Sequence, residues 1–236
     1  AGTPNFLAEV DDSTWLFDQK DTLRIWEFHV NWLNPTSSTL GLDGDPNQKL
    51  PVADFIPYTA GSSSACLTQN CIPQPNSAPK LDAIGDRLMH RLQYRYFNSY
   101  ETLVVNHTVE TPTGSAGVRW YELRNSGDEW KIRQQGTYGG NPPDALYRWN
   151  GSAAMNKNGD LALGYSVSSE TVFLSIRYTV RKASDTLHSL GVETELVAGG
   201  GVQNTTSGRW GDYSMLSVDP LDDCTFWYTS IYYQTT

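Results

Sequence analysis

The chain has 236 residues and a formal net charge of −9, and 39% of its residues are hydrophobic. Its basic residues are scattered singly, which argues against a protein that binds nucleic acid or anionic membrane surfaces. No apolar run approaches the roughly 20 residues of a membrane-spanning helix. The chain opens Ala-Gly-Thr-Pro without an initiator Met, which indicates a processed product. Low Lys and abundant Asn, Ser and Thr predict a secreted, extracellular protein.

The first 86 residues predict four short strands separated by turn-rich loops. Alternating apolar residues and runs of aromatic and β-branched residues indicate the strands. These predicted strands are 7–11, 14–17, 23–28 and 54–58. The segments 34–50 and 60–80 are rich in Gly, Pro, Ser and Asn, so we expect them to be loops.

The two predicted loops hold a candidate disulfide and a candidate calcium site. Cys66 and Cys71 flank Leu-Thr-Gln-Asn, which predicts a local disulfide in an oxidising compartment, with two free thiols as the alternative. No further Cys or nearby His completes a zinc site. The carboxylate oxygens of Asp43 and Asp45 are spaced as the ligands of a calcium loop could be. The distal Glu of an EF-hand loop is absent, so an ordinary turn is favoured, and we expect no other cofactor.

A repeat with a fixed period follows these loops. Arg87, Arg148 and Arg209 lie 61 residues apart, and the last two begin the pairs Arg148-Trp149 and Arg209-Trp210. Strand-like segments recur after the first two arginines. They are 101–109, 117–123 and 129–138 in one unit, and 160–167, 171–180 and 193–200 in the next. Together with the segment that each arginine begins, each unit contains about four short strands, and no helical periodicity is present.

These units predict an all-β fold, namely a β-propeller of four-stranded antiparallel blades. The blades would span 1–86, 87–147 and 148–208, and residues 209–236 would form half a blade. A closed propeller needs about four or more blades. We therefore expect this single domain to be part of a larger ring that is either completed by a second chain or truncated, because an open half-blade edge invites aggregation.

Three segments carry a resemblance to a known family. They are RWGDYSMLSVDPLDDCTFWYT, NGDLALGYSVSS and GVRWYEL. With them the chain resembles large secreted bacterial repeat proteins described as sialidase-like or BNR/Asp-box-like, well over 86–236 and weakly over 1–85. The resemblance implies a six-bladed ring, of which this chain is a little over half. The Asp-box pattern has only a degenerate counterpart at 126–130, and no Tyr-Glu nucleophile pair can be assigned.

The periodic arginines are the first candidates for ligand binding. Arg87, Arg148 and Arg209, with Trp149 and Trp210, would lie near one rim of the central channel. Guanidinium groups arranged in a ring could bind a carboxylate or sulfate. The alternative is a structural arginine repeated in each blade, stacked on tryptophan or paired between blades. This alternative is favoured, because residues that match the period usually serve the repeat.

Asp212 and Tyr213 are weak candidates for a catalytic role. Asp212 lies near Arg209 and could act as an acid or base, but glycosidic cleavage needs a second carboxylate at a suitable separation. A hydrogen-bonded structural Asp is favoured. The four His residues show no metal-ligand spacing.

Four positions are candidates for covalent modification or pairing. Asn106, Asn150 and Asn204 begin glycosylation sequons, and Asn204 lies in an evident loop, which makes it the best acceptor. Cys224 is expected to be a small buried hydrophobic residue, with a bond to another chain as the alternative.

These features predict a secreted propeller module with a binding or structural role toward a glycan or a partner protein. One alternative is a sialidase-like glycoside hydrolase or lyase that acts on acidic glycans. Another is a subunit of an extracellular assembly whose half-blade pairs with a second chain by β-strand addition.

Overall fold

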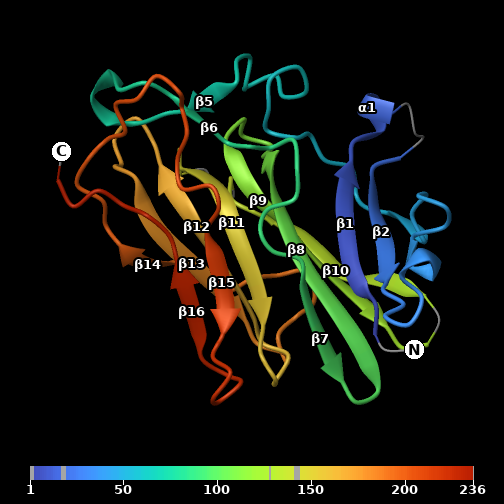
Figure 1. Cartoon of the computed structure of the whole chain (residues 1–236). Coiled ribbons are helices and arrows are strands. Elements are labelled where there is room, and N and C mark those ends of the chain that lie inside the picture. The colour runs from blue at the N-terminus through green and yellow to red at the C-terminus, as the bar shows by residue number, and fades with distance from the viewer. Residues whose placement is uncertain (1–2, 17–19, 128, 141–143, 236) are drawn as a thin grey trace.

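The computed structural model describes residues 3–16, 20–127, 129–140 and 144–235, and within them the chain is all-β. Antiparallel sheets follow one another along the chain and stand side by side (Figure 1). None of these described sheets closes on itself. No helix in the described ranges is long and apolar enough to cross a membrane.

The first sheet is built around one central strand. Its strands are β1 (Asn5–Asp11), β2 (Thr22–His29), β3 (Thr39–Leu40) and β4 (Gln48–Pro51). β2 pairs with β1 along one edge and with both short strands along the other. A 3₁₀ turn, η1 (Pro35–Ser37), precedes β3. The predicted strands 7–11 and 23–28 are confirmed, whereas 34–50 is not wholly loop.

Two further predictions for this region are wrong. The helical turn α1 (Ser13–Leu16) stands where a strand was predicted over 14–17, and residue 17 lies outside the described ranges. Asp12 causes the difference, because its Oδ1 accepts from the Thr14 backbone N–H at 2.7 Å and closes a turn. The segment 54–58 forms only one isolated bridge, Pro57 to Val109, since Pro57 has no N–H to donate to a ladder.

The second and third sheets are four-stranded meanders in which consecutive strands pair. The second contains β7 (Gln93–Phe97), β8 (Tyr100–Glu110), β9 (Ala116–Asn125) and β10 (Trp130–Tyr138). The third contains β11 (Tyr147–Met155), β12 (Leu161–Ser168), β13 (Ser175–Arg181) and β14 (Thr194–Val197). The four strands expected in each of the units 87–147 and 148–208 are thus confirmed.

Two small sheets complete the described fold. β15 (Met215–Val218) and β16 (Phe226–Thr229) form the hairpin expected in the last half-unit. β5 (Asn70–Ile72) and β6 (Leu81–Asp82) pair within the long cysteine-containing segment, and the 3₁₀ turn η2 (Pro75–Ser77) lies between them. The strand β5 was not expected within the predicted loop 60–80.

Side-chain hydrogen bonds join the first strands of successive sheets. Gln93 of β7 accepts from the Met155 backbone N–H of β11 at 2.6 Å. Ser152 Oγ of β11 accepts from the Leu216 N–H of β15 at 2.9 Å. Because these groups are buried, each bond also satisfies a backbone group that would otherwise be unpaired. The first strands β7, β11 and β15 are therefore fixed beside one another.

Candidate functional site

A cavity of about 300 Å³ lies at one end of the first strands. Asp86 and Arg87 line it from the segment before β7, and Arg209 and Tyr213 line it from the segment before β15. The remaining wall comes from the segment that contains β5 and β6. Its lining residues are Thr59, Ala60, Gln69, Asp82 and Ile84. The structure thus brings together three of the predicted site residues, Arg87, Arg209 and Tyr213.

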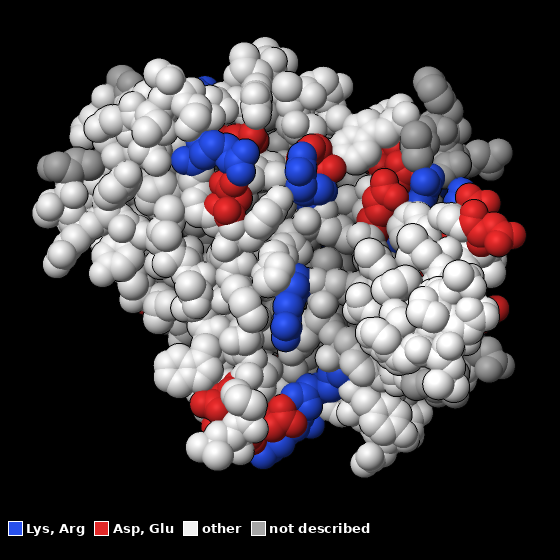
Figure 2. Space-filling view, viewed as in Figure 1, with Lys and Arg blue, Asp and Glu red and all other residues white. Residues whose placement is uncertain are grey.

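Both arginines of the cavity are paired with a neighbouring aspartate. Arg87 binds Asp86 with two hydrogen bonds, Nε to Oδ1 at 3.0 Å and Nη2 to Oδ2 at 2.6 Å. Arg209 Nη2 forms an ion pair with Asp212. Figure 2 shows basic and acidic side chains next to one another in the upper part of this face. The cavity therefore alternates hydrogen-bond donors with acceptors and does not present one sign of charge.

Each aspartate favours the charged form of its guanidinium group. The hydrogen bond from Arg87 to Asp86, and then the charge of Asp86, raise the pKa of Arg87. The hydrogen bond to Asp212 and its charge likewise raise the pKa of Arg209. Tyr213 adds an aromatic ring that is 51% exposed. Such a set can donate to and accept from hydroxyl groups while a ring face offers apolar contact.

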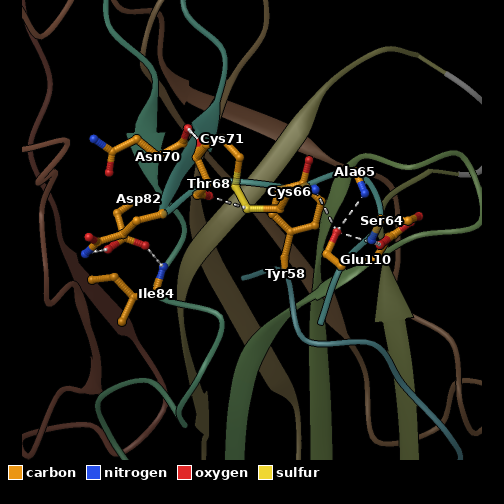
Figure 3. The surroundings of a disulfide bond; sticks show 12 residues. Tyr58, Ser64, Ala65, Cys66, Thr68, Asn70, Cys71, Asp82, Ile84 and Glu110 are labelled. Carbon is orange, nitrogen blue, oxygen red and sulfur yellow. Dashed lines mark hydrogen bonds between the residues drawn. A yellow bond between two sulfur atoms is a disulfide. The ribbon is translucent and has the colours of Figure 1, made fainter. Parts of the chain in front are cut away.

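The disulfide lies in the segment that forms one wall of the cavity. Cys66 and Cys71 are bonded, as the sequence predicts (Figure 3). Both are buried in a core cluster with Tyr58 and Leu81. β6 pairs with β5, the strand that contains Cys71, and Asp82 of β6 accepts from the Ile84 N–H at 2.8 Å through Oδ1. The other carboxylate oxygen of Asp82 accepts from Gln69 Nε2 at 3.0 Å. The disulfide-bonded segment thus holds two polar side chains at the cavity wall.

One backbone contact ties this segment to the arginine segment. The Asp82 N–H donates to the Gly208 carbonyl at 2.8 Å, directly before Arg209. Gly208 has φ +69°, and a Cβ there would lie 2.2 Å from Asn70 Oδ1. Only glycine accepts both the positive φ and the close approach. Gly208 therefore sets where Arg209 enters the cavity.

Arg148 lies outside this cavity. It is 5% exposed, and its guanidinium binds Glu193 at 2.7 Å and also Asp144. Tyr138 of the second sheet lies under the guanidinium at 5.9 Å. Burial disfavours the charge, but the hydrogen bonds to the two carboxylates outweigh it and raise the pKa of Arg148. The three periodic arginines therefore do not converge, and Arg148 has the paired arrangement of the structural alternative.

The two tryptophans that follow the periodic arginines lie in the core. Trp149 and Trp210 are both buried and belong to the cluster around the disulfide. Trp210 Nε1 donates to Ser166 Oγ at 3.3 Å. Neither ring is available to stack on a ligand in this structure, so the aromatic group of the cavity is Tyr213.

Two of the three predicted glycosylation sites are incompatible with the fold. Asn106 is 0% exposed and Asn150 is 1% exposed, so no sugar can be attached to either side chain in the folded chain. Asn150 Nδ2 instead donates to the Trp210 carbonyl at 2.7 Å. Asn204 is exposed in a loop and remains a sterically open acceptor.

The remaining candidates lie away from the cavity. Asp43 and Asp45 sit in a turn closed by the Leu42 N–H, which donates to the Asp45 carbonyl at 2.8 Å. Among the described residues, no group of three or more His, Cys, Asp or Glu side chains could hold a metal ion.

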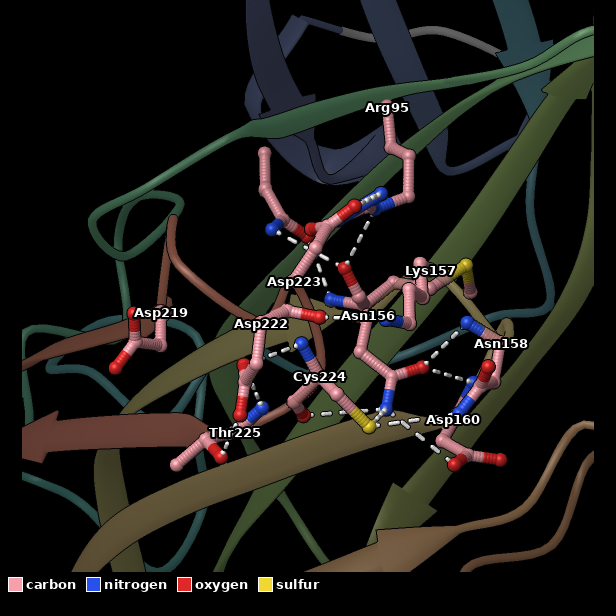
Figure 4. Close-up of polar contacts among 12 residues, drawn as sticks. Arg95, Asn156, Lys157, Asn158, Asp160, Asp219, Asp222, Asp223, Cys224 and Thr225 are labelled. Atoms are coloured by element: carbon pink, nitrogen blue, oxygen red, sulfur yellow. Dashed lines mark hydrogen bonds and ion pairs between the residues drawn. The ribbon is translucent and has the colours of Figure 1, made fainter.

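Cys224 is half-buried and unpaired, rather than fully buried as the sequence suggested. Asn156 Nδ2 and Asn158 Nδ2 lie 3.6 and 3.5 Å from its Sγ. Nearby, Arg95 of β7 binds Asp223 across the end of the hairpin (Figure 4). This cluster fastens the turn between β15 and β16 to the strands beneath it.

Sequence reasoning missed Asp82 and Gln69 as cavity residues. Both belong to the cysteine-containing segment, and no local sequence pattern indicates that this segment lies beside Arg209. Asp86 had one signal, its direct adjacency to Arg87.

Comparison of the chain with protein-family models, with curated proteins and with solved structures found no match. The sialidase-like resemblance therefore stays a hypothesis.

Proposed function

We propose that this protein is a secreted binding module and that the cavity lined by Arg87, Arg209 and Tyr213 binds a glycan. The observation that carries the proposal is the pairing of each cavity arginine with an aspartate beside an exposed tyrosine ring. A sugar hydroxyl both donates and accepts, so a guanidinium–carboxylate pair can satisfy it fully. Because the positive charges are already balanced, a neutral glycan fits better than an acidic one.

Two features of the fold support the wider proposal. The consecutive four-stranded meanders pack with their first strands adjacent, which is the arrangement expected of propeller blades. The disulfide between Cys66 and Cys71 fits an oxidising, extracellular compartment. We further propose that these blades belong to a larger propeller ring.

Titration of neutral and acidic glycans by calorimetry tests the binding role. We expect Arg87→Ala, Arg209→Ala and Tyr213→Ala each to weaken binding of a hit about tenfold or more, since each removes a contact worth about 1.4 kcal/mol. Arg133→Ala is the matched control, because Arg133 is exposed and lines a different pocket. Folded protein that binds no glycan would contradict the proposal. Cleavage of the bound glycan would favour the sialidase-like hydrolase instead.

An assembly role is the second candidate, and the free edge of β16 favours it. The Asp219 N–H donates to the Thr225 carbonyl at 2.8 Å, which fixes the alternation of bonded pairs along the hairpin. The backbone N–H and C=O groups of Phe226 and Tyr228 consequently point away from β15. No described strand pairs with β16 along this outer edge. Such an edge can accept an added strand.

Solution mass tests this second role. We expect an assembly heavier than one chain, and we expect Trp227→Lys to weaken it, because Trp227 is exposed on β16 and charges protect strand edges. A protein that stays monomeric over a wide concentration range, in both forms, would contradict it.

A further inference from the structure

Arg119 is a buried cation whose bonds go to uncharged acceptors. It lies on β9, is 7% exposed, and no described carboxylate forms an ion pair with it. Nη2 donates to the Ala53 carbonyl at 3.0 Å and to Gln135 Oε1 at 2.6 Å, and Nη1 donates to Thr137 Oγ1 at 3.3 Å. Nε has no partner. Three of the five N–H groups of the guanidinium are thus engaged, all without a counter-charge.

Arg177, the corresponding arginine of the third sheet, has the carboxylate partners that Arg119 lacks. Arg177 occupies the third strand of the third sheet, as Arg119 occupies the third strand of the second. Its cross-strand partner on the fourth strand is Glu195, which binds it at 3.1 Å, and Glu193 binds it at 2.6 Å. The cross-strand partner of Arg119 is Thr137. The second sheet therefore keeps the arginine but lacks the carboxylate.

The uncompensated charge acts on its surroundings. Burial is the first reason why the pKa of His107 is lowered to about 3, and the charge of Arg119 is the second. The Tyr121 ring lies 5.3 Å from the guanidinium and offers only a weak cation–π contact. A buried charge without a partner is unfavourable, so an anion that reached Arg119 would be bound with a strong gain.

A cavity of about 630 Å³ opens beside this guanidinium. Arg119 and Thr137 both line it, and Nη1 binds the Thr137 hydroxyl, so we expect the Nη1 side to meet the cavity. Most of the other wall is apolar. Its apolar residues are Phe55, Ile56, Val109 and Pro112.

Two acidic residues also line this cavity. The Glu110 carboxylate is held by Ser63 Oγ at 2.6 Å and by the Ser64 N–H at 3.1 Å. Asp54 is exposed. Neither forms an ion pair with Arg119.

We propose that this second cavity binds an organic acid, with its carboxylate on Arg119 and Thr137 and its apolar body against Phe55 and Val109. The site is separate from the glycan cavity, which is lined by none of these residues. The charge supplies the preference for an anion, and the apolar wall supplies the preference for a hydrocarbon body.

Calorimetric titration of the whole protein with hexanoate and with uncharged hexanamide tests the site. We expect hexanoate to bind at one site, with a dissociation constant of about 1 mM, as suits so small a probe. Hexanamide should bind at least about tenfold more weakly. Octanoate should bind about 15-fold more tightly than hexanoate, because it has two more CH₂ groups and each contributes about fourfold when buried.

Two substitutions locate the binding. Arg119→Met keeps an apolar stem but removes the charge, and it should abolish the difference between acid and amide. Thr137→Glu restores the carboxylate that Glu195 supplies in the third sheet; it should raise the melting temperature and lower hexanoate affinity at least about tenfold. This second variant decides the question even if Arg119→Met does not fold.

The control is Arg87→Met, which alters the glycan cavity alone and should leave hexanoate binding unchanged. Equal binding of hexanoate and hexanamide by the unaltered protein would overturn the proposal. Unchanged hexanoate binding by folded Thr137→Glu would overturn it as well. Loss of glycan binding in Arg87→Met with hexanoate binding intact would separate the two proposals.

Discussion

The ring of Tyr228 lies directly on the backbone of Gly164. Tyr228 belongs to β16 and Gly164 to β12, and a Cβ at position 164 would lie 2.8 Å from the ring. Tyr228 is half-buried there, and Ala154, Ala162 and Leu216 form the core of the same contact. Position 164, which only glycine fits, is therefore one of the contacts that fix the hairpin β15–β16 to the third sheet.

Replacing Gly164 with alanine should loosen the hairpin. The added methyl group must displace the Tyr228 ring, and such overpacking costs about 1–3 kcal/mol of unfolding free energy. Urea denaturation would measure the loss. Gly127→Ala is the control, since nothing lies within 4 Å of a Cβ there. Equal stability of Gly164→Ala and the unaltered protein would show that the contact is not tight.

Removal of the disulfide should destabilise the chain moderately. Cys66 and Cys71 are separated by five positions, and a loop this short gives about 2 kcal/mol by the chain-entropy estimate. We expect Cys66→Ala/Cys71→Ala to lose that much in denaturant and to weaken glycan binding, because Asp82 and Gln69 depend on this segment. Cys224→Ser, which removes an unpaired thiol, should change neither property.

Stability should fall in acid because His107 is held neutral. Its pKa is lowered to about 3 in the folded chain, whereas the ordinary value is 6.5. Between these values the unfolded chain binds a proton that the folded chain does not. The contribution of neutral His107 is therefore complete above pH 6.5 and is lost as the pH falls toward 3, by about 1.4 kcal/mol per pH unit at most.

Denaturation of His107→Gln from pH 7 to pH 4 checks this dependence. The unfolding free energy of the variant should depend on pH less steeply than that of the unaltered protein, by up to one proton. His90→Gln is the control, because His90 is exposed and should keep the full slope. Identical slopes for His107→Gln and the unaltered protein would mean that folding does not lower the pKa of His107.

The strong features of the sequence predicted the second and third sheets well. Most of their strands are seven to eleven residues long, rich in aromatic and β-branched residues, and pair with their neighbours in the sequence, so local pattern and pairing agree. The strands of the region before them were harder to predict, because β3 to β6 are only two to four residues long. At Ser13–Leu16 the aromatic and apolar composition indicated a strand, but the Asp12 turn decided the conformation.

The candidate site was predicted in part for a similar reason. The periodic spacing brought Arg87 and Arg209 to one cavity, as expected of residues that precede equivalent strands. Arg148 belongs to the same period, but it lies inside β11, where both faces of the strand are buried. Sequence alternation cannot then tell which face a side chain joins, and the Glu193 partner lies too far along the chain to be inferred.

The periodic arginines should consequently differ in what they contribute to stability. Arg148→Gln removes two ion pairs of a buried guanidinium group, but Glu193 keeps Arg177 and Tyr165 as partners, so we expect a loss of about 2–3 kcal/mol. Arg87→Gln removes an exposed ion pair with Asp86 and should cost about 1 kcal/mol or less. Urea denaturation of the two variants side by side measures the contrast. Equal losses of unfolding free energy in the two variants would mean that Arg148 contributes no more to stability than an exposed arginine. Arg148 would then again be a candidate for ligand binding.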